Sequence, residues 1–396
     1  MLRWIRQTVA VTILGIRTIP RRFGASVVAI VGIAGVVVVF VSVLSIAAGF
    51  NAAMVGAGSS SRAIVMRSGS DSEMTSGLIG PDTDVVKEAP GIAQLDHKPV
   101  AAAEMYVVID LNKRSTGTPA NVPVRGIEPM SLEVRKEVKI VEGRMLQFGT
   151  NEAVVGRAAQ HQFQGIDLGS EYVSKQLTLK IVGIFDSKGS VAESEVWADV
   201  RTLQSAYRRG NSYQSVLALL DTPASFQGFK DWLTTSANLT VNARPEDEYY
   251  KSQTQVMTSL INGIGYITAA LMGVGAVFGA ILTMYTAVAT RTREIATLRA
   301  LGFNTFAVLV SVLGEALALG AIGGIIGGAL AYIGFNGYET ATMNFQTFSQ
   351  VAFAFKVTPS LLSQGLIYSL LMGLIGGLLP AIRAARLPIS SALREL

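Results

Sequence analysis

Side chains capable of catalysis are scarce in this sequence, and none stands in a catalytic pattern. The 396 residues include no cysteine, which excludes disulfides and thiol chemistry. The only histidines, His97 and His161, lie far apart and outside any metal-ligand motif. No G-x-S-x-G nucleophile motif occurs, and no spacing marks a pair of carboxylates as general acid and base. We therefore assign no catalytic residue, no metal site and no cofactor to this chain, and we expect its acids to be solvated.

One short charged segment between apolar runs has a distinctive pattern. Apolar residues recur at helical spacing with charges between them, and the segment ends on a glycine suited to terminate a helix. This predicts a short amphipathic helix. It is either a basic flank lying on lipid or a docking element for a cytoplasmic partner. The residues assigned to it are Arg291, Arg293, Glu294, Ile295, Leu298, Arg299, Leu301 and Gly302.

A lone carboxylate, Glu315, interrupts the apolar run that follows. It lies about ten residues into a predicted membrane helix, or roughly 15 Å from the helix end. Acids at such depth are costly and usually face protein or water. A functional charge and a protonated or hydrogen-bonded structural glutamate both stay open. The other predicted membrane helices contain no ionisable residue for a proton relay, which argues against an ion-coupled transporter.

Four long apolar stretches surround these groups. Half of all residues are hydrophobic and 15% are charged, whereas soluble proteins have roughly 25% charged residues. Each stretch exceeds the ~20 apolar residues that span a ~30 Å hydrocarbon core. Each must be a helix, because a backbone in lipid has to satisfy its own hydrogen bonds. The first stretch is longer than the roughly 7–15 apolar residues of a signal peptide, so we favour a membrane helix there over a cleaved signal.

Glycines recur at small-xxx-small spacing in these helices. Such spacing lets helix backbones approach closely in lipid. It is explained by packing within one bundle or between two subunits, and we expect both. The candidate packing residues are Gly320, Gly324, Gly328, Gly373 and Gly377, with Gly275 and Gly279 in the second apolar stretch.

The distribution of basic residues predicts the topology. The first 23 residues carry five arginines and no acid, and the short charged segment and the C-terminal tail are also basic. By the positive-inside rule all three are cytoplasmic. Residues 51–255 hold 21 bases and 24 acids, a net charge of −3. The pI near 9.3 thus reflects the cytoplasmic membrane surface, which favours anionic lipid over nucleic acid as a contact.

The long segment after the first span predicts an α+β domain with its own core. Strand candidates are 63–67, 106–111, 122–126, 177–185, 214–220 and 239–243, and a helix is expected from Thr222 with Pro223 at its first position. Residues 246–260 lack Pro and Gly, so the second span should continue outward as a stalk.

The predicted fold is an α-helical membrane protein with four transmembrane helices and an α+β extracytoplasmic domain between helices one and two. Its divisions are a cytoplasmic amphipathic helix 1–23, spans 24–50, 260–289, 305–335 and 361–383, the domain with its stalk 51–259, the cytoplasmic helix 290–304, a short external loop 336–360 and a cytoplasmic tail 384–396.

The arrangement resembles the permeases of the MacB, LolC/LolE and FtsX superfamily of ABC transporters, the mechanotransmission or type VII class. The most specific match is 293–302, which looks like the coupling helix that seats in the ATP-binding subunit, and Glu315 and the ending 380–388 also fit. Weaker similarities to the core domain lie at 142–144, 152–156, 179–185 and 195–197. MacB itself carries an ATP-binding domain, but no G-x-x-x-x-G-K-[ST] phosphate loop occurs here. The resemblance therefore implies that ATP and Mg²⁺ bind a separate ATPase subunit.

The resemblance implies a permease in the bacterial inner membrane, with both termini cytoplasmic. Expected partners are the ABC ATP-binding subunit, a second permease copy or a paralogue, membrane lipids and, in an export system, a membrane-fusion or adaptor protein. ATP hydrolysis would move the external domains and drive export or extraction of a drug, peptide or lipoprotein already outside. The alternative is an FtsX-like transducer that switches an extracellular cell-wall hydrolase, although such proteins tend to have smaller external domains. A membrane-bound enzyme lacks any catalytic constellation.

Overall fold

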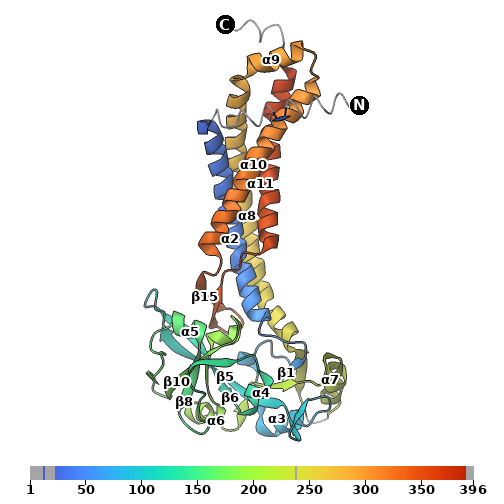
Figure 1. Cartoon of the computed structure of the whole chain (residues 1–396). Coiled ribbons are helices and arrows are strands. Elements are labelled where there is room, and N and C mark those ends of the chain that lie inside the picture. The colour runs from blue at the N-terminus through green and yellow to red at the C-terminus, as the bar shows by residue number, and fades with distance from the viewer. Residues whose placement is uncertain (1–11, 14–22, 237–238, 389–396) are drawn as a thin grey trace. The chain divides into compact units, whose positions relative to one another are not determined.

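The computed structural model describes residues 12–13, 23–236 and 239–388 (Figure 1). They form two compact units. A membrane unit contains residues up to 48, 260–337 and 356 onward, and an external unit contains 49–259 and 338–355. Most of the predicted N-terminal helix and the last eight residues of the tail lie outside the described residues.

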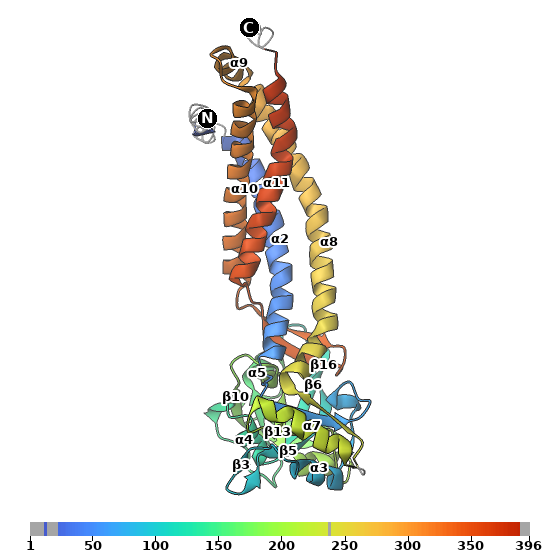
Figure 2. The ribbon, with the colours of Figure 1, turned by 90° about the vertical axis from the view of Figure 1, so that its right-hand side faces the viewer.

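Four helices of the described chain are long and apolar enough to cross a membrane. In Figure 2 their apolar parts run alongside one another. α8 is unbroken over 44 residues, about 66 Å at ~1.5 Å per residue, so it extends well beyond a ~30 Å hydrocarbon core. The sequence 246–260 contains no Pro or Gly to stop it, as expected. The helices of this group, with the short α9, are α2 (Phe23–Val55), α8 (Glu246–Ala289), α9 (Thr292–Ala300), α10 (Thr305–Phe335) and α11 (Pro359–Arg386).

The external unit is built around one large mixed sheet. Its main path follows the order β14-β1-β13-β5-β6-β11-β8-β10-β7, and β9 pairs with β10. Neighbours are antiparallel, except that β6 pairs parallel with β11 and β8 pairs parallel with β10. The strands are β1 (Arg62–Arg67), β2 (Leu78–Ile79), β3 (Gln94–Leu95), β4 (Lys98–Pro99), β5 (Ala101–Asn112), β6 (Pro119–Ile127), β7 (Lys139–Gly143), β8 (Glu152–Gly156), β9 (Glu171–Val173), β10 (Thr178–Asp186), β11 (Val196–Asp199), β12 (Ser212–Tyr213), β13 (Ser215–Leu219) and β14 (Val241–Pro245).

Helices and turns of the external unit lie between these strands. The described residues of this unit form one apolar core around β5, β6, β8 and β10 and another between β1, β13 and the helices α3 and α7. A smaller third cluster surrounds Phe185 and Trp197. Phe229 and Leu233 of α7 are buried in the second core, because they lie four residues apart on one helix face. The remaining elements are α3 (Gly80–Lys87), α4 (Met130–Val134), α5 (Arg157–Gln162), α6 (Val200–Ala206), α7 (Phe226–Thr235) and the 3-10 turns η2 (Glu73–Thr75), η3 (Val191–Ser194) and η4 (Pro223–Ser225).

All six predicted strands exist, and the fold is the predicted one of four spans with an α+β domain between the first two. Two local expectations need correction. The helix expected from Thr222 begins as the 3-10 turn η4, and the α-helix α7 starts at Phe226. The predicted short loop 336–360 contains a hairpin of β15 (Glu339–Asn344) and β16 (Ser349–Ala354). This hairpin belongs to the external unit, where Tyr106 is hydrogen-bonded to Ser349 at 2.9 Å.

Candidate functional site

The predicted amphipathic helix is α9, and it sits between the ends of α8 and α10. Its C-terminus closes as predicted around Gly302, which has a φ of +90°. Gly302 N donates to the Arg299 carbonyl and Phe303 N donates to the Leu298 carbonyl, which together form a Schellman motif. This cap fixes where the helix stops and turns the chain into α10, whose N-cap is Asn304.

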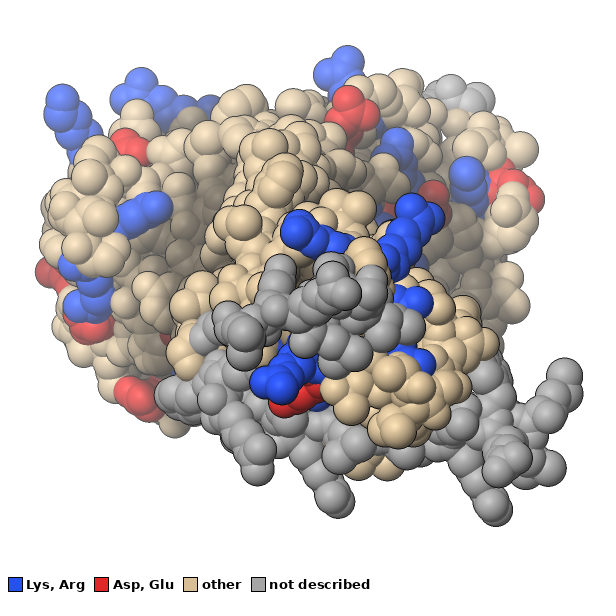
Figure 3. All heavy atoms as spheres, turned by 90° about the horizontal axis from the view of Figure 1, so that it is seen from above, with Lys and Arg blue, Asp and Glu red and all other residues tan. Residues whose placement is uncertain are grey.

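Basic side chains gather at the α9 end of the membrane unit. Figure 3 views this end and shows blue Lys and Arg atoms outnumbering red acids around the centre. Arg293 is exposed, and Arg383 near the end of α11 stacks over the ring of Tyr285 in α8 at 5.5 Å. The basic residues of α9, its flank and the end of α11 are Arg291, Arg293, Arg299, Arg383 and Arg386. This surface suits an acidic protein or anionic lipid.

The three apolar residues assigned to the α9 face do not share one environment. Ile295 is 7% exposed and packs in a core cluster with Met284 of α8 and Val308 of α10. Leu298 is half-buried, whereas Leu301 is 73% exposed. Ile295 is an internal anchor of the described chain, because α9 folds back against α8 and α10. Leu301 is the free apolar group of this face.

Arg291 is an ionic link between three helices. It stands at the N-cap of α9, directly after α8. Its Nε donates to Glu294 at 2.9 Å and its Nη1 donates to Glu315 of α10 at 2.5 Å. Glu315 is 5% exposed, so the isolated intramembrane acid of the sequence has a cationic partner. The sequence alone did not reveal the pair, because the two residues are 24 positions apart and Arg291 lies outside the predicted span.

A second contact ties α9 to α11. Arg299 donates from Nη1 to the carbonyl of Leu387, the C-cap residue of α11. A cation there also interacts favourably with the negative end of the α11 dipole. Arg299 thus holds the end of α9 against α11 within this chain.

The predicted packing glycines lie between helices of the same chain. A Cβ at Gly320 would come within 2.8 Å of the Ser369 carbonyl, and one at Gly373 within 2.7 Å of the Ala316 carbonyl. Gly324, Gly328 and Gly377 also face the partner helix of the α10–α11 pair. Gly275 and Gly279 of α8 have nothing within 4 Å. The named glycines of α10 and α11 therefore serve internal packing, whereas Gly275 and Gly279 meet no described residue.

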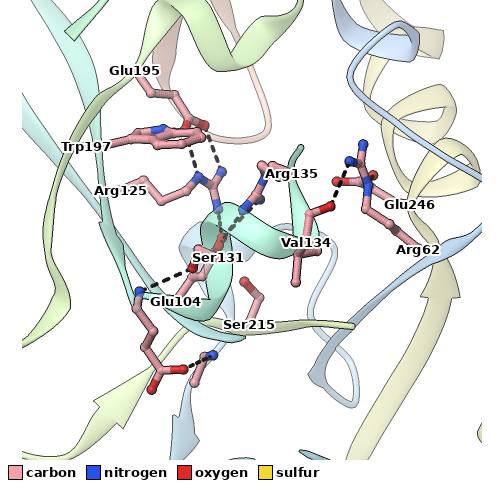
Figure 4. A network of polar contacts seen from close by, with 12 residues as sticks. Arg62, Glu104, Arg125, Ser131, Val134, Arg135, Glu195, Trp197, Ser215 and Glu246 are labelled. Atoms are coloured by element: carbon pink, nitrogen blue, oxygen red, sulfur yellow. Dashed lines mark hydrogen bonds and ion pairs between the residues drawn. The ribbon is translucent and has the colours of Figure 1, made fainter. Parts of the chain in front are cut away.

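The external unit contains a buried ionic network centred on Arg125 (Figure 4). Arg125 is 2% exposed. Its five N–H donors reach three carboxylates, with Glu195 at 2.7 Å, Glu73 at 2.8 and 3.0 Å and Glu104 at 2.9 Å. A guanidinium has five donors, so Arg125 is fully satisfied. Complete pairing of this kind is what makes a buried charge tolerable.

Further groups saturate the same carboxylates. Arg135 also pairs with Glu104, Trp197 Nε1 donates to Glu195 at 2.7 Å and Ser215 Oγ donates to Glu73 at 2.7 Å. Burial alone would raise the pKa of Glu104, but Arg135 and Arg125 together lower it to about 2. Each of the three carboxylates accepts from at least two donors, so the network is suited to hold strands together rather than to transfer protons. Sequence reasoning missed it, although charges inside apolar strands, as in Val124-Arg-Gly, were the available signal.

The start of α8 is held by a second ionic cluster, centred on Arg62. Glu246, the first residue of α8, accepts from Arg62 Nε at 2.5 Å and from Ser59 N at 3.1 Å. Arg62 also donates to the carbonyl of Ala57, just after α2, and pairs with Glu137 at 2.6 Å. The external ends of α2 and α8 are thus held together at one arginine.

Among the described residues no group of three or more His, Cys, Asp or Glu could hold a metal.

Comparisons with known proteins match both parts of the chain. Residues 26–236 match the model of the MacB-like periplasmic core domain, and residues 266–389 match that of the FtsX-like permease C-terminal domain. The macrolide export ATP-binding/permease protein MacB of Pasteurella multocida is 24% identical over 332 residues, 77% of this chain and 48% of that protein. An uncharacterised ABC transporter permease of Bacillus subtilis, YknZ, is 32% identical over 146 residues, 36% of this chain and 32% of that protein.

A solved structure also aligns with this chain. The periplasmic region of MacB from Actinobacillus actinomycetemcomitans gives a TM-score of 0.38 at 10% identity, covering 51% of this chain and 96% of that one. The chain spans about half the length of the MacB proteins that it matches.

Proposed function

Because the chain belongs to the MacB/FtsX family of ABC transporter permeases and its 396 residues contain no G-x-x-x-x-G-K-[ST] phosphate loop, we propose that it is a permease subunit driven by a separate ATP-binding chain. In this proposal α9 docks on the ATPase at the cytoplasmic face of the bacterial inner membrane. ATP hydrolysis then moves the external domain and drives export or extraction of an extracytoplasmic substrate. The substrate candidates remain a hydrophobic drug, a peptide or a lipoprotein.

The observation that carries the proposal is the attachment of α9. One side of this short helix is fixed to the bundle by Ile295, by the Arg291–Glu315 pair and by the Arg299 bond to α11. Its other side presents Arg293 and the exposed Leu301. A helix held this way transmits a push to α8, α10 and α11 together. A basic flank lying on lipid would not need three separate attachments.

Continuous helices support transmission beyond the bilayer. α2 extends from Phe23 to Val55 and α8 from Glu246 to Ala289 without a break. Their external ends meet at Arg62. In this proposal, movement of the membrane helices is passed to the external unit along α2 and α8. The match of residues 26–236 to the MacB-like core domain favours transport over the alternative of a hydrolase switch.

The test is co-purification with a co-expressed ATPase and its hydrolysis rate in nanodiscs. We expect Leu301→Asp to abolish ATPase binding or to uncouple hydrolysis from the permease, since a buried aliphatic anchor contributes roughly 1.5–3 kcal/mol. Leu301→Met is the matched control and should keep both. Because Leu301 is exposed in the isolated chain, the fold should survive either change. Normal binding and coupling in Leu301→Asp would remove the docking role of α9.

A further inference from the structure

A small buried cavity lies inside the external unit, where the outer part of α8, the β15–β16 hairpin and the Arg125 network meet. Its volume is about 20 Å³. Every residue that lines it is buried, so its walls separate it from bulk solvent. Roughly 10–15 Å³ of such space is enough for one water molecule. The cavity therefore suits a single molecule of that size.

Two residues that line the cavity each have a side-chain oxygen without a hydrogen-bond partner. They are Gln253 on α8 and Gln350 on β16, and the unpaired atom of each is Oε1. Both residues are buried, at 3% and 8% exposed. Among the described residues only one other buried side-chain nitrogen or oxygen is unpaired. Buried polar groups are nearly always satisfied, so two unpaired acceptors at one cavity indicate a hydrogen-bond donor inside it.

The amide of Gln253 cannot satisfy its oxygen by turning over. Its Nε2 donates to the backbone carbonyl of Asp71 at 2.9 Å. Exchanging the two ends of the amide would lose this bond and place an oxygen against a carbonyl oxygen. The free end of Gln253 is therefore an acceptor, and its partner has to supply a proton.

A chain of three hydroxyls at the same cavity has one proton to spare. Tyr106, Thr347 and Ser349 all line the cavity. The Tyr106 hydroxyl lies 2.9 Å and Thr347 Oγ1 lies 2.8 Å from Ser349 Oγ. Each hydroxyl has one proton, and these two bonds use two of the three. The described contacts give the third O–H no acceptor, so this end of the chain is a donor.

We propose that the cavity binds one water molecule, which donates to Gln253 Oε1 and Gln350 Oε1 and accepts the spare O–H of the hydroxyl chain. The two protons of the water match the two unpaired oxygens, and one of its lone pairs takes the third bond. About three hydrogen bonds are usual for a buried water. The water joins α8 to the hairpin that connects α10 and α11. The inference concerns the external unit alone and does not depend on the proposed transport function.

A monovalent cation is the alternative occupant, because it would also suit two amide oxygens. It would, however, face the guanidinium of Arg125, which lines the same cavity, and like charges repel at short range. A cation would also leave the spare O–H without an acceptor. A neutral molecule that both donates and accepts satisfies all three groups.

Gln350→Met tests the site by the sign of its effect on the unfolding of the full chain in nanodiscs. With a bound water, the change removes one of the three partners of that water, and the unfolding midpoint of the external unit should fall. Without a bound water, the change replaces an unsatisfied oxygen by an apolar group, and the midpoint should stay or rise. A midpoint that stays or rises overturns the proposal. Gln147→Met, at an exposed position of the same unit, is the matched control and should leave the midpoint unchanged.

Two measurements on the unmodified chain identify the occupant without a substitution. A crystallographic or cryo-electron microscopy map that resolves ordered waters should show one peak within about 3 Å of both glutamine oxygens. An empty cavity in such a map would overturn the proposal. Unfolding midpoints in NaCl, KCl and choline chloride at equal concentration should agree. A midpoint that is raised by one metal salt, and is no longer raised in Gln350→Met, would assign the cavity to a cation instead.

Discussion

Arg291 and Glu315 form a 2.5 Å ion pair that joins the corner between α8 and α9 to the interior of α10. Glu315 is the acid that the sequence places deep in a span, and the arginine is the residue that the sequence places at the membrane surface. Their pairing neutralises a charge that would otherwise be costly in lipid. It also makes the position of α9 depend on α10.

The pair predicts different results for two substitutions of Glu315. Glu315→Gln keeps an oxygen that accepts from Arg291, so assembly and most activity should survive. Glu315→Leu leaves Arg291 with one partner fewer, and an unsatisfied buried donor costs about 1–3 kcal/mol. The measurement is thermal unfolding in nanodiscs together with ATPase coupling.

A double substitution separates packing from charge in this pair. Arg291→Leu combined with Glu315→Leu should cost less than the sum of the two single changes, because each single change leaves one member unpaired. Additive costs would mean that the pair is energetically unimportant. If Glu315→Gln abolishes function while assembly is normal, a charge-dependent role of Glu315 replaces the packing role.

The glycines of the bundle predict a contrast between two helices. Gly320→Ala places a methyl group against the α11 backbone, and overpacking of that kind costs about 1–3 kcal/mol. Gly279→Ala meets no atom within 4 Å, so the stability of the single chain should stay the same or rise slightly. Thermal unfolding of detergent-solubilised monomer measures both. Should Gly279→Ala alter only the oligomeric state, the α8 face is used between subunits.

Topology is testable because the chain has no natural cysteine. Thr116→Cys and Lys188→Cys occupy exposed positions of the external unit and should react with a membrane-impermeant thiol reagent in spheroplasts. Thr297→Cys, exposed on α9, should react only after permeabilisation. Labelling of position 297 from outside would reverse the orientation and exclude α9 as a cytoplasmic docking helix.

Hydropathy and local patterning were sufficient to predict the four spans, the α+β domain and the helix 292–300. These features follow from runs of apolar residues and from caps such as Gly302, whose signals are local. The partners of Arg291 and Arg125 could not be predicted, since their carboxylates are brought near by tertiary folding. The hairpin β15–β16 was missed because its strands are short and polar at the start, as in Glu339-Thr-Ala-Thr. Ile295 and Leu301 looked equivalent by spacing, and only the packing of α9 distinguishes them.

The Arg125 network predicts a large stability effect in the external unit. Arg125→Met would leave three buried carboxylates without their shared donor, and breaking a buried ion pair costs about 3–5 kcal/mol. Arg144→Met is the matched control. It removes the Arg144–Glu152 pair, in which the arginine is 56% exposed, and solvent screens such a pair, so its loss should change stability little. Equal effects of the two changes on chemical unfolding would show that the network does not stabilise the domain.

The same network predicts acid sensitivity of the external unit. Glu104 ionises with a pKa of about 2 in the folded chain against an ordinary value of 4.5, and Arg125 also lowers the pKa of Glu73. A carboxyl whose pKa is lower in the folded chain than in the unfolded chain contributes its full stabilisation at pH values above the unfolded-state pKa. That stabilisation is lost as the pH falls toward the folded-state pKa. For Glu104 this amounts to about 3 kcal/mol. The midpoint of unfolding should therefore decrease as the pH is lowered from about 5 to about 2.

Glu104→Gln should be less stable than the unmodified chain at neutral pH, and its stability should decline less steeply as the pH is lowered. Glu171→Gln, at an exposed position on β9, should follow the unmodified chain. An unchanged slope in Glu104→Gln would place the acid-sensitive groups outside this network.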